Sequence, residues 1–216
     1  MGGFKSIVEG FYKKDHFIKR FIMVVLAVTV MGFSLSFLLL VNLGTDPCTM
    51  MNKAIAARIG MSIGNWQALL NVLLLIAVLI FGGRNLGFGT LANMFLVGYS
   101  IDFFSWLWEK VLPLEAFQLW SVRIGVFVPA FLIFIFAAAV YMDVDLGTAP
   151  YDAIPMIVSS HLEKVPFKAV RITFDFLVIG IGLIFGGKPE LVTILVAAFL
   201  GPVIEFVGKY VEKICS

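Results

Sequence analysis

The sequence predicts an all-helical protein that crosses a membrane several times, and three observations carry this prediction. Of its 216 residues, 61% are hydrophobic and only 14% are charged, whereas soluble proteins average about 45–50% and about 25%. The mean hydropathy is +1.02. Long apolar segments recur along the chain, and one unit of sequence occurs twice. A water-soluble fold could not bury so much apolar surface, so the pattern predicts a polytopic membrane protein.

The duplicated unit is the most specific of these features. The segment LGTDP at 43–47 returns as LGTAP at 146–150, an offset of 103 residues. The segment LIFGG at 79–83 returns unchanged at 183–187. Internal repeats of this kind are typical of membrane transporters. The sequence therefore predicts two tandem homologous repeats.

Each repeat is predicted to contain three long transmembrane helices and one short helix. The short stretches, 46–60 and 149–162, follow the first long segment of each repeat and open at a Gly-Thr-x-Pro turn. Glycine permits a sharp break, and proline in the first turn of a helix loses no intrahelical hydrogen bond. The long apolar segments are each near the ~20 residues that a spanning helix needs. They cover residues 20–42, 64–81, 89–108, 119–141, 167–185 and 190–209.

The same pattern predicts the organisation of the chain. A basic cytoplasmic N-terminus (1–19) precedes repeat 1 (20–109), a linker (110–122) and repeat 2 (123–216), which together form one integrated membrane domain. The apolar run that follows the basic residues is too long for the core of a signal peptide, so it is expected to remain as the first spanning helix.

Whether the short helices cross the membrane decides the topology. Crossing short helices give parallel halves related by a pseudo-two-fold axis along the membrane normal; re-entrant short helices give inverted halves. With the N-terminus inside, parallel halves place 13 Lys and Arg inside and 2 outside, and inverted halves place 11 inside and 5 outside. Like charge also recurs at equivalent positions, Arg20 with Arg123 and Arg84 with Lys188. The positive-inside rule therefore favours parallel halves, with both termini cytoplasmic. Re-entrant helices stay the alternative, because irregular backbone is tolerated inside a bundle.

The two Gly-Thr-x-Pro turns are the first candidates for a substrate site. A helix that begins inside the bundle points its free N–H groups and its positive dipole end at the interior, where an anionic group would be stabilised. The alternative interpretation is an ordinary helix-capping device. The residues predicted to bind substrate here are Gly44, Thr45, Pro47, Gly147, Thr148, Pro150 and Asp152.

Polar residues within the long segments extend the candidate site. Asp175 lies in the middle of the fifth segment, and Arg171 is four residues earlier on the same helix face, within reach of a salt bridge. The first repeat has Gln67 and Asn71 at the equivalent positions. A charge at bilayer depth is costly, so these four residues are predicted to contact substrate. They are equally explained as an ion pair and a polar seam that locate neighbouring helices.

Acidic residues near the ends of the third long segment of each repeat form a second candidate. Asp102 and Glu205 occupy equivalent positions and are predicted to form an ion or proton relay, with helix capping as the alternative. Lys53 lies in the middle of the first short helix and must face a cavity, a carboxylate or the cytoplasm. The sequence contains no metal-binding spacing and no nucleophile–base arrangement. We therefore expect no enzyme activity, no metal and no cofactor.

These motifs resemble a known family. The double Leu-Gly-Thr turn, Ser-Ile-Gly-Asn at 62–65, and Gly-Phe-Gly-Thr-Leu-Ala-Asn at 87–93 leading to Gly98 and Asp102 are similar to the YczE/YyaS/YitT-like bacterial integral membrane proteins. The resemblance extends from about residue 20 to near the end of the chain and is looser in the second repeat, where Ala-Pro-Tyr-Asp at 149–152 fits the pattern. It implies a multi-pass protein of the bacterial inner membrane, without an agreed substrate.

The sequence thus favours a small-solute permease with its site between the two repeats. The alternative is a non-transporting accessory or regulatory membrane protein. The expected partners are the lipid bilayer and an unidentified small solute, with no nucleic acid; a homo-oligomer or a membrane-protein partner stays open. A permease needs a water-accessible cavity that reaches the midplane of the membrane, whereas the interior of an accessory protein can be tightly packed without water.

Overall fold

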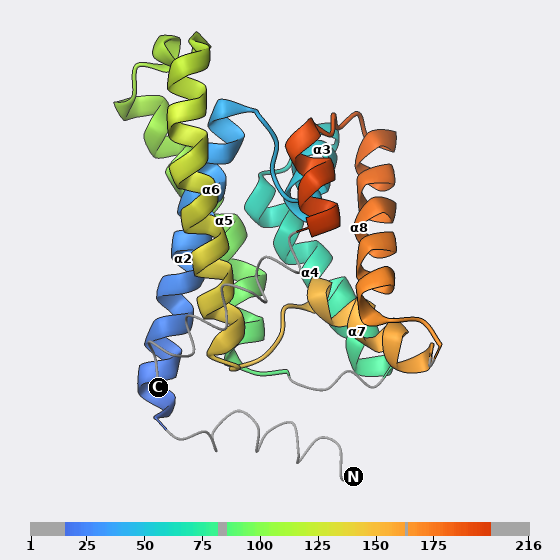
Figure 1. Ribbon diagram of the computed structural model, residues 1–216. Coiled ribbons are helices and arrows are strands. Elements are labelled where there is room, and N and C mark those ends of the chain that lie inside the picture. Colours follow the sequence, from blue (N-terminus) through green and yellow to red (C-terminus); the bar gives the residue numbers. More distant parts are fainter. Residues whose placement is uncertain (1–15, 82–85, 163, 200–216) are drawn as a thin grey trace.

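The computed structural model describes residues 16–81, 86–162 and 164–199, and most of them are helical (Figure 1). A further helix begins at residue 191, and its described part runs over 191–199. The other helices are α2 (Phe17–Val41), α3 (Pro47–Ile59), α4 (Ile63–Ile80), α5 (Phe88–Val111), the 3-10 helix η1 (Leu114–Gln118), α6 (Trp120–Asp143), α7 (Pro150–His161) and α8 (Phe167–Ile184).

Both short helices begin at the proline of a Gly-Thr-x-Pro turn. α3 starts at Pro47, and the side chain of Asp46 caps it by accepting a hydrogen bond from the Thr49 N–H at 3.0 Å. α7 starts at Pro150. The two helices contain 13 and 12 residues, which is about 18–20 Å of helix. The hydrocarbon core of a bilayer is about 30 Å thick, so neither helix is long enough to cross it.

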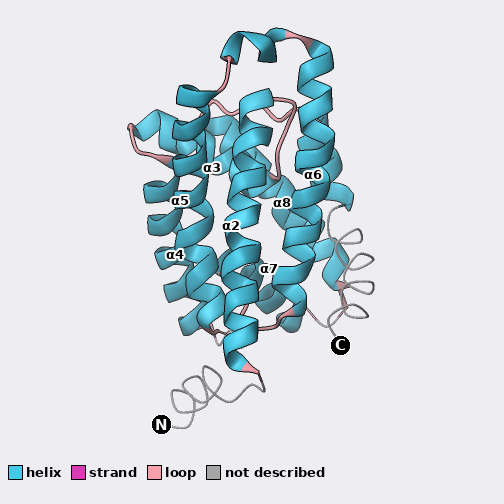
Figure 2. Cartoon of the chain, turned by 90° about the vertical axis from the view of Figure 1, so that its left-hand side faces the viewer, coloured by secondary structure: helices cyan, strands magenta, loops and turns pink. Residues whose placement is uncertain are grey.

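Helices α2, α5 and α6 pack together along their length, with α2 between the other two (Figure 2). Their buried aliphatic and aromatic side chains form the largest apolar core. α2 and α5 run in the same direction: the rings of Phe17 and Phe88 lie 5.4 Å apart near the helix starts, and Trp108 Nε1 donates to Ser36 Oγ at 2.9 Å near their ends. If α3 and α4 both crossed the bundle, α2 and α5 would be antiparallel. Their parallel arrangement therefore fits a short helix α3 that re-enters, so that α4 alone crosses between them.

Two arginines show that α2 and α6 are antiparallel. Arg20, at the start of α2, donates from Nη1 to the Val144 carbonyl oxygen just after α6, at 2.8 Å. Arg123, at the start of α6, donates to the carbonyl oxygens of Val41 and Asn42 at the end of α2, at 2.8 and 2.9 Å. Parallel halves would make these two helices run the same way. The preference for parallel halves is therefore wrong, and the alternative of re-entrant short helices fits the fold.

The error has a clear physical reason. The last carbonyl groups of a helix have no intrahelical donor and need another partner. Arg20 and Arg123 supply that partner reciprocally, each to the C-terminal end of the other's helix. Their matching positions in the two halves thus reflect a shared structural task. They carry no information about which side of the membrane each residue faces.

The two short helices lie toward opposite ends of the bundle, and we call these the α3 end and the α7 end (Figure 1). α3 runs beside the C-terminal part of α8, where Gly182 and Gly187 let it approach closely: an added Cβ on either glycine would lie 2.8 Å from Met50 Sδ. The first turns of α3 and α7 approach each other in the interior, where Cys48, Met51 and Tyr151 belong to one apolar cluster.

Candidate functional site

The first Gly-Thr-x-Pro turn is held by the helix that begins at residue 191. Gly44 has φ +122°, a conformation that L side chains rarely adopt, and an added Cβ would lie 2.8 Å from Val192 Cβ. The Thr45 N–H donates to Thr193 Oγ1 at 3.2 Å, and Thr45 and Thr193 are both buried. The turn is therefore built by residues from both halves of the sequence.

The second turn is held by the start of α5, and here the threonine side chain donates to the turn where Thr193 accepts from it. Gly147 has φ +118°. The Gly89 N–H donates to the Leu146 carbonyl oxygen at 2.8 Å, and Thr90 Oγ1 donates to the Thr148 carbonyl oxygen at 2.9 Å. Each turn is thus fixed by the start of a helix from the opposite half of the sequence, α5 or the helix that begins at residue 191. The threonines that do so, Thr90 and Thr193, occupy equivalent positions in the duplicated sequence.

The charged residues of α7 and α8 form one connected cluster. Arg171 Nε lies 3.1 Å from Asp175 Oδ2, so the predicted pairing is confirmed. Arg171 Nη1 also lies 2.6 Å from Asp152 Oδ1, and the Tyr151 hydroxyl donates to Asp175 Oδ1 at 2.7 Å. Asp152 and Tyr151 belong to α7, so the cluster ties the short helix to α8. Asp175 is buried, with both carboxylate oxygens accepting hydrogen bonds.

The matching residues of α4 face a different neighbour. Asn71 Nδ2 donates to the Met94 carbonyl oxygen at 3.4 Å. Gln67 lies against Gly98, where an added Cβ would be 3.2 Å from Gln67 Oε1. Both side chains are buried and form a polar seam between α4 and α5. The structure thus distributes the predicted substrate-binding residues over the two turns, this seam and the charged cluster, and does not gather them in one pocket.

Asp102 has a definite structural partner. Its Oδ2 atom accepts a hydrogen bond from the Gly64 N–H at 2.9 Å, in the first turn of α4. A carboxylate at a helix N-terminus satisfies a free N–H group and interacts favourably with the helix dipole. This geometry is the capping arrangement that the sequence offered as the alternative to a relay. The relay role stays a prediction, and Glu205 lies outside the described residues.

A cavity of about 430 Å³ opens at the α3 end of the bundle. Its floor consists of buried residues, among them Gly44, Thr45 and Thr193, while Lys53 and Lys188 stand exposed at its mouth. Of the predicted substrate-binding residues, Gly44 and Thr45 line it. The complete lining is Leu38, Leu39, Asn42, Gly44, Thr45, Met50, Lys53, Ala54, Ala57, Arg58, Phe185, Gly186, Gly187, Lys188, Glu190 and Thr193.

α3 separates this cavity from the charged cluster. One face of the helix, including Met50 and Lys53, lines the cavity. The other face, including Cys48 and Met51, packs against Tyr151, a member of the charged cluster. A solute in the cavity and the ion pairs of Arg171 therefore lie on opposite sides of one short helix.

Sequence reasoning missed several residues of the cavity. Asn42, Lys188 and Glu190 lie in connecting segments, where charged and amide side chains are expected on any protein surface. The one available signal was Lys53, which was expected to face a cavity, a carboxylate or the cytoplasm; the structure places it in the cavity lining. Within residues 16–81, 86–162 and 164–199, no group of three or more His, Cys, Asp or Glu side chains could hold a metal ion.

The fold and composition define a polytopic α-helical membrane protein. α2, α4 and α6 are each long and apolar enough to cross a membrane. Large apolar side chains such as Leu73, Leu132 and Leu177 are more than half exposed on the outside of the bundle, as expected for contact with lipid.

Residues 18–209 match a family of unknown function (DUF6198), and the chain belongs to that family. It is 25% identical over 166 residues to the uncharacterized membrane protein YczE of Bacillus subtilis, covering 76% of this chain and 73% of YczE. It is 25% identical over 188 residues to an uncharacterized protein of Haemophilus influenzae, covering 87% and 83%. It is 21% identical over 189 residues to YyaS of Bacillus subtilis, covering 87% and 92%. The predicted resemblance to YczE and YyaS is confirmed. No solved structure matches the chain.

Proposed function

We propose that this protein is a small-solute permease of the bacterial inner membrane, built from two inverted halves. The observation that carries the proposal is the cavity of about 430 Å³, which runs from the α3 end of the bundle to the buried first Gly-Thr-x-Pro turn. Ligand-binding cavities of small-molecule sites typically occupy about 300–1,000 Å³. A permease requires a water-accessible cavity that ends at a buried turn between helices, such as the first Gly-Thr-x-Pro turn. An accessory protein with a tightly packed interior would have no such cavity.

Reciprocal contacts support the inverted arrangement. Each half would contribute three long helices and one short re-entrant helix, with a pseudo-two-fold axis in the membrane plane. Arg20 and Arg123 exchange equivalent hydrogen bonds, and Thr90 and Thr193 each hold the turn of the opposite half. Transporters built from inverted repeats commonly bind their substrate where discontinuous helices begin.

The position of α3 suggests how a solute would pass. A solute in the cavity meets Thr45 and Met50 and is stopped by the first turn of α3 and its packing against Tyr151. Transport would require α3 and its turn to shift relative to α7 and α8, opening the α7 end. Alternating access of this kind is the usual behaviour of inverted-repeat transporters.

Charge distribution orients the proposed permease. With inverted halves, and with Arg20 and Arg123 left out because they bond helix ends, the side that holds the N-terminus carries 10 of the Lys and Arg residues and the other side carries 4. The positive-inside rule then places the α7 end and both termini in the cytoplasm. The cavity would open to the exterior.

The topology can be tested by labelling single cysteines in intact cells, in a background where Cys48 and Cys215 are replaced by alanine. With inverted halves, Glu115→Cys and Lys188→Cys should both react with a membrane-impermeant maleimide from outside. Lys164→Cys should react only after the membrane is permeabilised. Labelling of Glu115→Cys and Lys188→Cys from opposite sides would instead require parallel halves and would contradict the contacts of α2 with α6.

Transport itself can be tested in liposomes. A metabolite library is first screened for compounds that raise the melting temperature of the purified protein, because a ligand of the native state stabilises it. Compounds that do so are then loaded into proteoliposomes, and their release is followed by mass spectrometry. We expect specific release that Ala57→Trp, at the mouth of the cavity, abolishes. The control Leu73→Trp, on the lipid-facing side of α4, should release at the wild-type rate. Stabilising compounds that are not released, or release that Ala57→Trp leaves unchanged, would contradict the proposal.

A further inference from the structure

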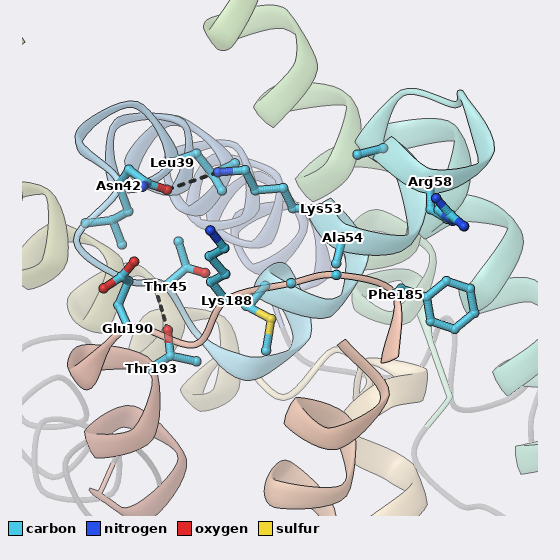
Figure 3. A pocket seen from close by; sticks show the side chains of 16 residues that line it. Leu39, Asn42, Thr45, Lys53, Ala54, Arg58, Phe185, Lys188, Glu190 and Thr193 are labelled. Carbon is cyan, nitrogen blue, oxygen red and sulfur yellow. Dashed lines mark hydrogen bonds between the residues drawn. The ribbon is translucent and has the colours of Figure 1, made fainter. Parts of the chain in front are cut away.

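The charges that line the cavity are unbalanced. Three basic side chains, Lys53, Arg58 and Lys188, line it together with one carboxylate, Glu190. Figure 3 shows Lys53, Lys188 and Glu190 gathered around Asn42 on one side, with Arg58 farther along α3 beside Phe185. Like charges held in a partly enclosed space repel one another more strongly than in bulk water. Such a site is therefore more favourable when it contains an anion.

The cationic groups are also available to a ligand. In the part of the chain that the structure describes, the salt bridges are those of Arg171, so neither Lys53 nor Lys188 is in direct contact with a carboxylate there, although Glu190 is near enough to attract Lys53. Lys53 Nζ donates to Asn42 Oδ1 at 3.3 Å. This contact uses one of three ammonium donors and directs the group across the cavity mouth.

The position of Lys53 is fixed by the fold. Arg123 donates to the Asn42 carbonyl oxygen at 2.9 Å and so holds the residue that accepts from Lys53. Asn42 itself ends α2 in a left-handed conformation, φ +50°. Lys53 stands on α3, one turn from Met50 at the buried part of the lining. A lysine at membrane depth is costly unless it has such a task.

We propose that this cavity binds a small solute that carries a carboxylate or phosphate group, with Lys53 and Lys188 as its ionic contacts. Glu190 opposes the anion and limits its affinity, which allows release. The inference rests on the proposed permease function and adds the class of substrate. Carboxylate and phosphate oxygens share the chemistry that ammonium groups recognise, so the experiment includes both.

The test is calorimetric titration of the detergent-purified protein with acetate, succinate, citrate and inorganic phosphate at low ionic strength. We expect saturable binding of at least one of these anions. Lys53→Met and Lys188→Met should each raise its Kd roughly tenfold or more, because a hydrogen bond to a charged group is lost. Glu190→Gln should lower the Kd. Lys110→Met is the matched control, because this lysine stacks on Trp106 at the same end of the bundle but outside the cavity. The Kd of the Lys110→Met protein for the anion should equal that of the wild type.

Three results would overturn the anion site. They are no binding of any of these anions, a Lys110→Met protein that binds the anion as weakly as Lys53→Met and Lys188→Met, and a Glu190→Gln protein that binds it more weakly than the wild type. Binding is measured without a membrane, so its outcome is separate from that of the release assay. If the protein binds an anion but does not release it from liposomes, the permease function is contradicted and the anion site is supported. If the protein binds no anion but releases neutral or cationic solutes, the anion site is contradicted and the permease function is supported.

Discussion

Gly147→Ala is expected to destabilise the protein by about 3 kcal/mol or more, through backbone strain and overpacking together. Gly147 has φ +118°, and an added Cβ would lie 2.5 Å from the Gly87 nitrogen and 2.7 Å from Thr90 Oγ1. The neighbouring backbone cannot withdraw freely, because the Gly89 N–H is bonded to Leu146 and Thr90 to Thr148. Thermal unfolding in detergent, followed by intrinsic fluorescence, measures the loss.

Two further alanine variants make this measurement specific. Gly44→Ala should also lower the melting temperature, since Gly44 has φ +122° and an added Cβ would lie 2.8 Å from Val192 Cβ. Gly125→Ala is the control: that glycine is in α6, and an added Cβ would have no neighbour within 4 Å. Its melting temperature should be unchanged or slightly higher. A Gly147→Ala protein as stable as Gly125→Ala would contradict the described turn.

Arg171→Gln is the second change with a large expected effect. It removes the cation that lies between Asp152 and Asp175 and leaves the buried Asp175 carboxylate without its ionic partner. Breaking a buried ion pair from one side typically costs about 3–5 kcal/mol. Because the Arg171 side chain is 23% exposed, we expect a loss near the lower end of that range. Asp152→Asn should lower the free energy of unfolding by less, because the Asp152 side chain is 31% exposed and Arg171 stays paired with Asp175.

The double variant Arg171→Gln with Asp175→Asn separates electrostatics from packing. It removes both charges of this pair, leaves the half-exposed Asp152 as the remaining carboxylate of the cluster, and places here the residue types that α4 has at Gln67 and Asn71. Because no carboxylate of the cluster then stays buried, it should unfold at a higher temperature than Arg171→Gln alone. If Arg171→Gln is as stable as the wild type, the cluster does not stabilise the fold. A double variant that folds but no longer responds to solute would assign the cluster to function.

Hydropathy predicted the helices well because burial in lipid is a local property of sequence. The six long segments and two short stretches expected from the sequence coincide with the observed helices to within a few residues in the described ranges. The helix starts at Pro47 and Pro150 were equally accessible, because a Gly-Thr-x-Pro turn acts within one helical turn of itself. The pairing of Arg171 with Asp175 followed from their spacing on one helix.

What the sequence could not supply are contacts between distant segments. Asp152 joins Arg171 from another helix, and Asn42 positions Lys53 from the end of α2. No spacing rule reports such neighbours. The direction of the two halves was misjudged for a related reason: charge counts treat Arg123 as a marker of membrane side, although its guanidinium is occupied with the end of α2.

Each Gly-Thr-x-Pro turn is completed by a threonine from the other half of the sequence, so the two halves are not separate structural units. The chain divides naturally near 110–122, yet the turn at 43–47 is completed by Thr193 and the turn at 146–150 by Thr90. A fragment containing one half would therefore lack the threonine that holds its own broken helix. The covalent link between the halves therefore keeps each turn and the threonine that holds it in the same molecule.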